Sequence, residues 1–160
     1  MTGIPRFAEY ESDLRAEHGS PGDRIVTVSG FTGVGTTTVA SILADAFDLE
    51  RIDAGDFFRE KAREHGMTID EFDSEAARIE EEQDVDFDLM WDRTAMKHAF
   101  TDDDIVLEGR LTGALLQDIA AVRVYVECDP RTVAERMRGR ETVSEEVPDE
   151  ESLDAIRSYV

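Results

Sequence analysis

The stretch GFTGVGTTT, residues 30–38, constrains the fold of this chain most, because of what lies on either side of it. The β-branched run IVTVS precedes it and indicates a buried strand. The segment TTTVASILADAF follows it and indicates a helix, with one apolar face made of Val39, Ile42, Leu43, Ala46 and Phe47. A strand, a glycine-rich turn and a helix in this order form the setting in which backbone amides and a helix N-terminus hold phosphate groups. The sequence therefore predicts a phosphate-binding loop.

One residue departs from the usual pattern of such a loop, which is Gly, four residues, Gly, Lys and then Ser or Thr. Thr36 stands where the lysine would be, between Gly35 and Thr37. Two interpretations are open: a nucleotide site that works without its lysine, and a plain glycine-rich turn. The strand before the loop and the helix after it favour the nucleotide site.

The acidic composition excludes several classes of protein. The 160 residues include 38 Asp or Glu against 17 Lys or Arg, which gives a net charge of −21. Periodic apolar segments argue against an acidic disordered chain, so we expect a folded protein of the kind that works in concentrated salt, where screening weakens surface repulsion. Nucleic acid is an unfavourable partner for such a surface, and no apolar run approaches the length that spans a bilayer. The lone Cys128 fits a reducing compartment, and we expect a cytoplasmic protein.

The alternation of strand-like and helix-like segments predicts an open parallel α/β sheet. Residues 1–24 are polar and are interpreted as an N-terminal appendage with a short helix around 7–17. Strands are expected at 25–29, near Ile52, at 104–109 and at 122–128. Helices are expected at 36–47 and at 84–99. Two more are expected between them, one that begins at a cap at Asp56 and one that runs from a capping box of Thr68 and Glu71 to about 80. Another is expected after the cap Asp129, with Pro130 in its first position, and a last one around Leu153, Ile156 and Arg157. Right-handed crossovers then place ligands at the carboxyl ends of the strands.

Arginines gather after the predicted strand ends, in a chain that is short of positive charge. Arg59 follows the second strand and Arg110 follows the third, while the helix after the fourth strand carries Arg136, Arg138 and Arg140. Any one of them is best explained by pairing with a nearby surface acid. Their joint placement at the edge that carries the glycine loop favours a site where two phosphorylated molecules meet.

The blocks GFTGVGTTT, AGDFFREKAREHGMTIDEF, VLEGRLTG and ERMRGRE occur in this order over about residues 25–157 and resemble the P-loop nucleoside monophosphate kinases, most closely the archaeal cytidylate (CMP/dCMP) kinases. The resemblance implies a parallel sheet of about four strands in the order 2-3-1-4, flanked by helices. It implies a kinase-like domain over 25–160, with a helical monophosphate-binding region at about 53–100 and a short lid at about 138–148. It also implies transfer of the γ-phosphate of ATP to CMP or dCMP, with Mg²⁺ as cofactor.

The same resemblance implies roles for individual residues. The ATP phosphates would be bound by the glycine loop, through Gly30, Gly33, Val34, Gly35, Thr36, Thr37 and Thr38. The acceptor monophosphate would be bound by Asp56, Arg59 and Arg110, and transfer would be assisted by the catalytic residues Arg110, Arg136, Arg140 and Arg157. Thr37 would ligate Mg²⁺ and Glu108 would hold a metal-bound water, although a solvated acid at a strand end also explains Glu108. Asp86 and Asp88 could accept from a cytosine amino group, but a solvated helix face explains them better, and Trp91 is expected in the core.

Two departures from the family pattern leave three functions open. Thr36 brings no charge to the donor phosphates, and the loss of one preorganised stabilising group costs on the order of 10² to 10³ in rate. The chain ends at Val160, where the family continues into a fifth strand, so one sheet edge is expected to be exposed or to pair with a second copy. The functions are a CMP or dCMP kinase whose arginines partly cover for the lysine, a nucleotide-binding protein of the same fold with a regulatory or scaffolding role, and another small-molecule kinase such as adenylate kinase.

Overall fold

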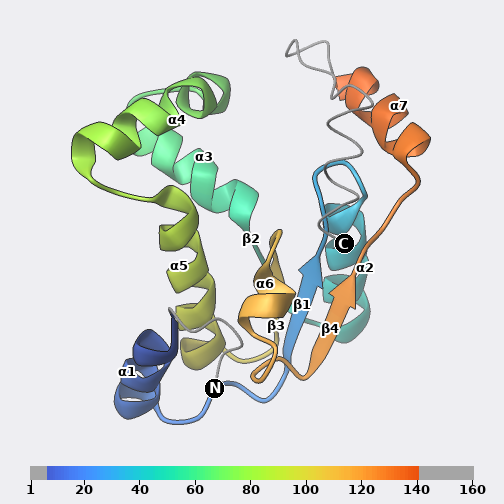
Figure 1. The fold of residues 1–160 in the computed structure, drawn as a ribbon. Coiled ribbons are helices and arrows are strands. Elements are labelled where there is room, and N and C mark those ends of the chain that lie inside the picture. The colour runs from blue at the N-terminus through green and yellow to red at the C-terminus, as the bar shows by residue number, and fades with distance from the viewer. Residues whose placement is uncertain (1–6, 141–160) are drawn as a thin grey trace.

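A computed structural model describes residues 7–140, which form a four-stranded parallel sheet with helices on both faces (Figure 1). The strand order is β2-β3-β1-β4, which confirms the expected order. The strands are β1 Ile25–Ser29, β2 Glu50–Asp53, β3 Ile105–Glu108 and β4 Val122–Tyr125. The helices are α1 Ala8–His18, α2 Thr36–Phe47, α3 Ala54–Glu64, α4 Ile69–Gln83, α5 Phe87–Thr101, α6 Thr112–Leu115 and α7 Pro130–Arg140. In the described part of the chain, no helix is long and apolar enough to cross a membrane.

Helix α2 covers one face of the sheet, where Val28 of β1 and Val106 of β3 pack against Ala40. The apolar face predicted for this helix is only partly right. Val39 and Leu43 pack against the sheet, but Ile42 is 60% exposed. The sheet contact therefore follows the narrower stripe of Val39, Ala40, Leu43 and Ala44.

The opposite face of the sheet carries the largest apolar cluster, formed with α5, α6 and α1. Helix α1, in the N-terminal segment that the sequence predicts to be an appendage, packs along α5. Phe7 and Leu14, seven residues apart, are both buried in this cluster. The described part of the N-terminal segment therefore contributes to the core of the sheet domain.

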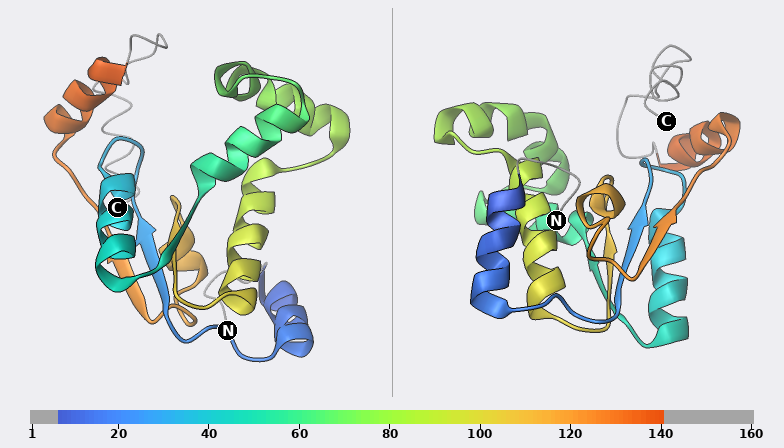
Figure 2. Two further views of the ribbon diagram at one scale, coloured as in Figure 1. Left: turned by 180° about the vertical axis from the view of Figure 1, so that it is seen from behind. Right: turned by 60° about the horizontal axis from the view of Figure 1, so that its bottom comes forward.

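Helices α3 and α4 and the beginning of α5 stand beyond the carboxyl ends of the strands, on one side, and α7 stands on the other (Figure 2). The first group has its own apolar cluster, in which Phe72 is fully buried. The ring of Phe72 lies 5.0 Å from that of Phe87 and 5.5 Å from that of His65. This cluster joins α3, α4 and the beginning of α5, which together are called the helical arm.

The first turn of α3 corrects one predicted cap. Asp53, not Asp56, caps the helix: its backbone is extended, and its side chain accepts a hydrogen bond of 2.8 Å from the backbone N–H of Asp56. An N-cap residue needs non-helical dihedral angles, and the last residue of β2 already has them. The helix consequently begins at Ala54, earlier than the sequence suggested.

The first turn of α4 forms the predicted capping box. Thr68 Oγ1 accepts from Glu71 N at 3.3 Å, and the Glu71 carboxylate accepts from Thr68 N at 2.8 Å. The backbone N–H and the hydroxyl of Thr68 both donate to the Glu71 carboxylate, and these hydrogen bonds lower the pKa of Glu71 below its usual value of 4.5. The stabilisation from this carboxylate is therefore present above that pH, and it is lost as the pH falls through the lowered pKa of the folded state.

We expect Thr68→Ala to lower the free energy of unfolding by about 1 kcal/mol, because the first turn of α4 loses its cap. Denaturant titration in concentrated KCl measures this change. Ser74→Ala is a matched control, since the Ser74 hydroxyl only bonds back to the carbonyl oxygen of Asp70 in the same helix. Equal losses in the two variants would show that the cap contributes nothing of its own.

Candidate functional site

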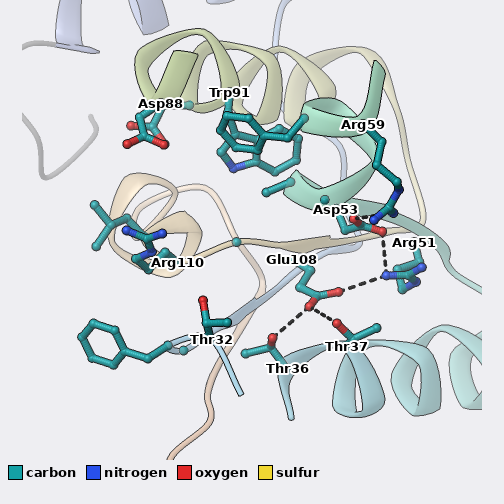
Figure 3. A pocket seen from close by; sticks show the side chains of 18 of the residues that line it. Thr32, Thr36, Thr37, Arg51, Asp53, Arg59, Asp88, Trp91, Glu108 and Arg110 are labelled. Atoms are coloured by element: carbon teal, nitrogen blue, oxygen red, sulfur yellow. Dashed lines mark hydrogen bonds and ion pairs between the residues drawn. The ribbon is translucent and has the colours of Figure 1, made fainter. Parts of the chain in front are cut away.

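The carboxyl ends of the strands border a cavity of about 580 Å³, a size typical of small-molecule sites (Figure 3). Its lining comes from the glycine loop, from β2 and α3, from α5 and from the segment after β3. The lining residues with charged or hydroxyl side chains are Thr32, Thr36, Thr37, Arg51, Asp53, Arg59, Asp86, Asp88, Asp92, Glu108 and Arg110.

The cavity brings together only part of the predicted site. The predicted residues that line it are Gly30, Thr36, Thr37, Arg59, Glu108 and Arg110. Those that do not line it are Gly33, Val34, Gly35, Thr38, Asp56 and Arg136. The side chain of Arg140 and the whole of Arg157 fall outside the described part of the chain.

The glycine loop has a shape that needs glycine at two positions. Gly33 and Gly35 have φ angles of 87° and 106°, in the left-handed region that residues with a Cβ rarely adopt. Gly35 is the N-cap of α2, and no side chain caps that helix. The first backbone N–H groups of α2 are therefore available to an anionic ligand, and the helix dipole favours negative charge there.

Helix α7 rests on the outside of the glycine loop. Arg136 Nη1 donates to the carbonyl oxygens of Gly33, at 3.3 Å, and Val34, at 3.0 Å. Val133 and Met137, on the same face of α7, lie so close to Gly33 that an added Cβ would be 3.2 Å from each side chain. In this structure Arg136 thus supports the loop backbone and does not point into the cavity.

Glu108, at the end of β3, connects the loop helix to the neighbouring strand. Its Oε1 accepts hydrogen bonds from Thr36 Oγ1 at 2.8 Å and Thr37 Oγ1 at 2.7 Å, and its Oε2 accepts one from Arg51 Nη1 at 3.0 Å (Figure 3). The residue is only 8% exposed, so it is not a solvated strand-end acid. Its carboxylate is fixed between two hydroxyl groups and one guanidinium.

Arg51 and Asp53 were missed by the sequence reasoning. Arg51 Nη1 lies 2.7 Å from Asp53 Oδ2, but this ion pair is not aligned as a hydrogen bond, and Oδ2 is buried without a donor. A signal was available, because alternate residues of a strand share a face and the order 2-3 places β2 beside β3. The register confirms that Asp53 lies directly beside Glu108. Arg51 lies inside β2, whereas the predicted arginines follow strand ends.

Arg59 points toward the acids of the first turn of α3. Its Nη2 lies 2.5 Å from Asp56 Oδ1 and 3.8 Å from Asp53 Oδ1. The hydrogen bond from Arg59 lowers the pKa of Asp56, and the same contact raises the pKa of Arg59. Both side chains are at least half exposed, so this pair can open at little cost when an anion competes for Arg59.

The remaining lining of the cavity comes from α5 and from the segment after β3. Trp91 is buried, as expected, and its ring packs 5.7 Å from Phe57, but it also borders the cavity. Asp86 caps α5 by accepting from Leu89 N at 2.7 Å. Asp88, in the first turn, faces the cavity across from Arg110 (Figure 3). The exposed side chain of Arg110 has no hydrogen-bond or ion-pair partner among residues 7–140.

The oxygen donors at the loop suit a magnesium ion. Among the described residues, no group of three or more His, Cys, Asp or Glu side chains could hold a metal ion. Mg²⁺ seldom needs such a group, because it keeps several waters and takes one or two protein oxygens together with substrate phosphates. The hydroxyl of Thr37 and the carboxylate of Glu108, 2.7 Å apart, are oxygen donors of this kind.

The sequence matches the AAA domain family over residues 26–156. Among curated relatives, the cytidylate kinase of Haloquadratum walsbyi is 39% identical over 138 residues, which are 83% of this chain and 69% of that protein. The cytidylate kinase of Archaeoglobus fulgidus is 38% identical over 72% of this chain and 61% of that protein. The cytidylate kinase of Halorubrum lacusprofundi is 44% identical over 73% of this chain and 58% of that protein. The matched region thus spans between 58% and 69% of these relatives.

Proposed function

Because this chain belongs to the cytidylate kinase-like family of AAA-domain proteins, we propose that it transfers the γ-phosphoryl group of ATP to a nucleoside monophosphate, CMP or dCMP. The observation that carries the proposal is the arrangement of the cavity. The uncapped N-terminus of α2, with Glu108 and Thr37, forms one part of its lining. Arg110 and Arg59 belong to other parts of the lining. Two phosphorylated molecules could therefore meet within one cavity.

The donor half of the site is the glycine loop. The backbone amides of residues 30–38 and the first turn of α2 would bind the phosphates of ATP. Thr37 and Glu108 would hold Mg²⁺, which, when bound, bridges phosphate oxygens and neutralises charge that develops on them. Arg136 would keep the loop in shape through its bonds to two loop carbonyl groups.

The acceptor half is formed by α3, α5 and the segment after β3. Arg110, which lacks a partner among residues 7–140, would bind the phosphate of the monophosphate, and Arg59 would join it after leaving Asp56. The indole of Trp91 and the carboxylate of Asp88 border the space left for the base. A carboxylate there suits cytosine, whose exocyclic amino group is a hydrogen-bond donor.

Catalysis of this reaction depends on position more than on covalent chemistry. In phosphoryl transfer, protein side chains mainly align the two phosphates and stabilise the negative charge on the oxygens of the transferred group. The uncapped N-terminus of α2, the oxygen pair of Thr37 and Glu108 and the unpaired guanidinium of Arg110 would provide both.

One observation favours a second function, a nucleotide-binding protein that does not transfer phosphate. Thr36 occupies the lysine position, and its hydroxyl donates to Glu108 at 2.8 Å. The loop therefore carries no positive side chain toward the donor phosphates. A protein of this design would bind Mg·ATP and leave it unchanged.

The experiment measures ADP formation from Mg·ATP in molar KCl, with CMP, dCMP, UMP and AMP supplied in turn. We expect slow turnover that depends on CMP or dCMP, because the arginines of the acceptor half are present and the loop lysine is not. The variant Thr36→Lys is assayed beside the parent. A preference for AMP would replace cytidylate by adenylate as the acceptor.

If the parent binds Mg·ATP but stays at background with every monophosphate, while Thr36→Lys turns over, the chain is a nucleotide-binding relative of the kinases. If neither protein turns over and neither binds nucleotide, both functions are excluded.

A further inference from the structure

We propose that Arg51 supplies, from the neighbouring strand, the positive charge that the glycine loop lacks, and that its guanidinium neutralises the terminal phosphates of the bound donor. The inference rests on the proposed function, since it concerns the donor half of the same site. It assigns to a residue inside β2 the work for which a P-loop normally uses its lysine.

The sheet places Arg51 within reach of the loop. Arg51 and Asp53 lie on the same face of β2, the face on which Glu108 approaches the first turn of α2. One oxygen of Glu108 accepts from Arg51 and the other accepts from Thr36 and Thr37. A single carboxylate therefore separates the guanidinium from the residue that stands in the lysine position (Figure 3).

Arg51 also has N–H donors that make no hydrogen bond within residues 7–140. Both of its contacts, with Asp53 at 2.7 Å and with Glu108 at 3.0 Å, are made by Nη1. Neither Nε nor Nη2 has a hydrogen-bond partner within residues 7–140, although a guanidinium carries five N–H donors. The side chain is 29% exposed and lines the cavity. A phosphate oxygen that enters from the cavity side can thus be bound without breaking either ion pair.

The other cations of the described chain are less suited to this task. Arg59 is paired with Asp56, and Arg110 shares no partner with the loop threonines among residues 7–140. Arg136 is bound to the loop carbonyls outside the cavity, and Lys61 pairs with Glu64 on α3. Among the cations that line the cavity, Arg51 is the one joined to the loop threonines through a shared partner.

A purely structural role for Arg51 makes a different prediction. Asp53 and Glu108 are both nearly buried, and a cation between two buried carboxylates stabilises the fold whether or not a nucleotide binds. In that case, replacing Arg51 would lower the free energy of unfolding, and a lysine introduced at position 36 of the loop would not restore nucleotide binding or turnover. Rescue from the lysine position separates the two roles.

The test compares four proteins in molar KCl: the parent, Arg51→Gln, Thr36→Lys, and the double variant Arg51→Gln with Thr36→Lys. Binding of the non-hydrolysable analogue AMPPNP with Mg²⁺ is measured by titration calorimetry, and kcat and KM for ATP are measured with CMP in excess. Arg24→Gln is the matched control, because Arg24 also pairs with an acid, Asp104, but does not line the cavity. Thermal unfolding reports stability for each protein.

We expect Arg51→Gln to weaken Mg·AMPPNP binding at least about tenfold and to lower kcat by about 10², the cost of one preorganised donor. The double variant should recover most of the Mg·AMPPNP affinity and most of kcat. Its melting temperature should stay that of Arg51→Gln. Binding and kcat within twofold of the parent in Arg51→Gln, or a loss that the loop lysine does not restore, would overturn the proposal. A parent that transfers to no monophosphate refutes the proposed function instead, and the binding series still decides the role of Arg51.

Discussion

Arg110→Ala is expected to lower kcat/KM for the acceptor monophosphate by about 10² to 10³, the effect of removing one preorganised donor at a charged group. The reason is that Arg110 lines the cavity and has no partner among residues 7–140, so its donors are available to a phosphate. Most of the loss should be in binding of the acceptor, and the KM for ATP should change little. Steady-state rates with varied CMP at saturating Mg·ATP measure kcat and the KM for CMP, and rates with varied Mg·ATP at saturating CMP measure the KM for ATP.

Two variants sharpen this prediction. Arg78→Ala removes an arginine that pairs with Glu75 and Glu82 on the surface of α4, away from the cavity, and should leave the rates unchanged. Arg110→Lys should recover only part of the activity, because an ammonium group cannot hold a phosphate with two parallel hydrogen bonds. Equal values of kcat/KM for Arg110→Ala and Arg78→Ala would show that Arg110 does not bind the acceptor.

Phe72→Ala should lower the free energy of unfolding by about 3–5 kcal/mol, the usual cost of emptying a buried aromatic position. Phe72 is fully buried at the centre of the cluster that joins α3, α4 and α5, and it touches the rings of His65 and Phe87. Because these helices carry Arg59 and Asp88, the variant should also bind acceptor more weakly. Denaturant titration in molar KCl measures the stability change.

Phe47→Ala is the matched control for the same chemical change. The side chain of Phe47 is 59% exposed at the end of α2, so its removal leaves no cavity, and we expect a change within about 0.5 kcal/mol. A loss in Phe72→Ala no larger than that in Phe47→Ala would mean that the helical arm is not held together by this cluster.

Local signals allowed much of the fold to be predicted. The strand and helix around the glycine loop, the capping box at Thr68 and the cap at Asp129 all rest on contacts within a few residues of sequence, and each is present in the structure. The strand order came from the resemblance of four blocks to a known family. Where a pattern is local, or where a whole set of blocks is shared, the sequence is sufficient.

The remaining features depend on what lies across the fold. The burial of Phe7 requires α5 as a partner, and a polar N-terminal segment gives no sign of it. The exposure of Ile42 depends on how α2 is rotated against the sheet, which helical spacing alone does not determine. The contact of Arg51 with Glu108 joins residues 57 positions apart. Predicting it would have required combining the order of β2 and β3 with the alternation of side chains along β2, whereas Arg59 and Arg110 could be predicted from strand ends alone.

The contact between α7 and the glycine loop joins two parts of the site mechanically. Arg136 holds the carbonyl oxygens of Gly33 and Val34, while Val133 and Met137 rest on the Gly33 backbone. Helix α7 cannot move away from the sheet without either breaking these bonds or drawing the loop with it. We expect a ligand that fixes the loop to restrain α7 as well, because these contacts join the two elements.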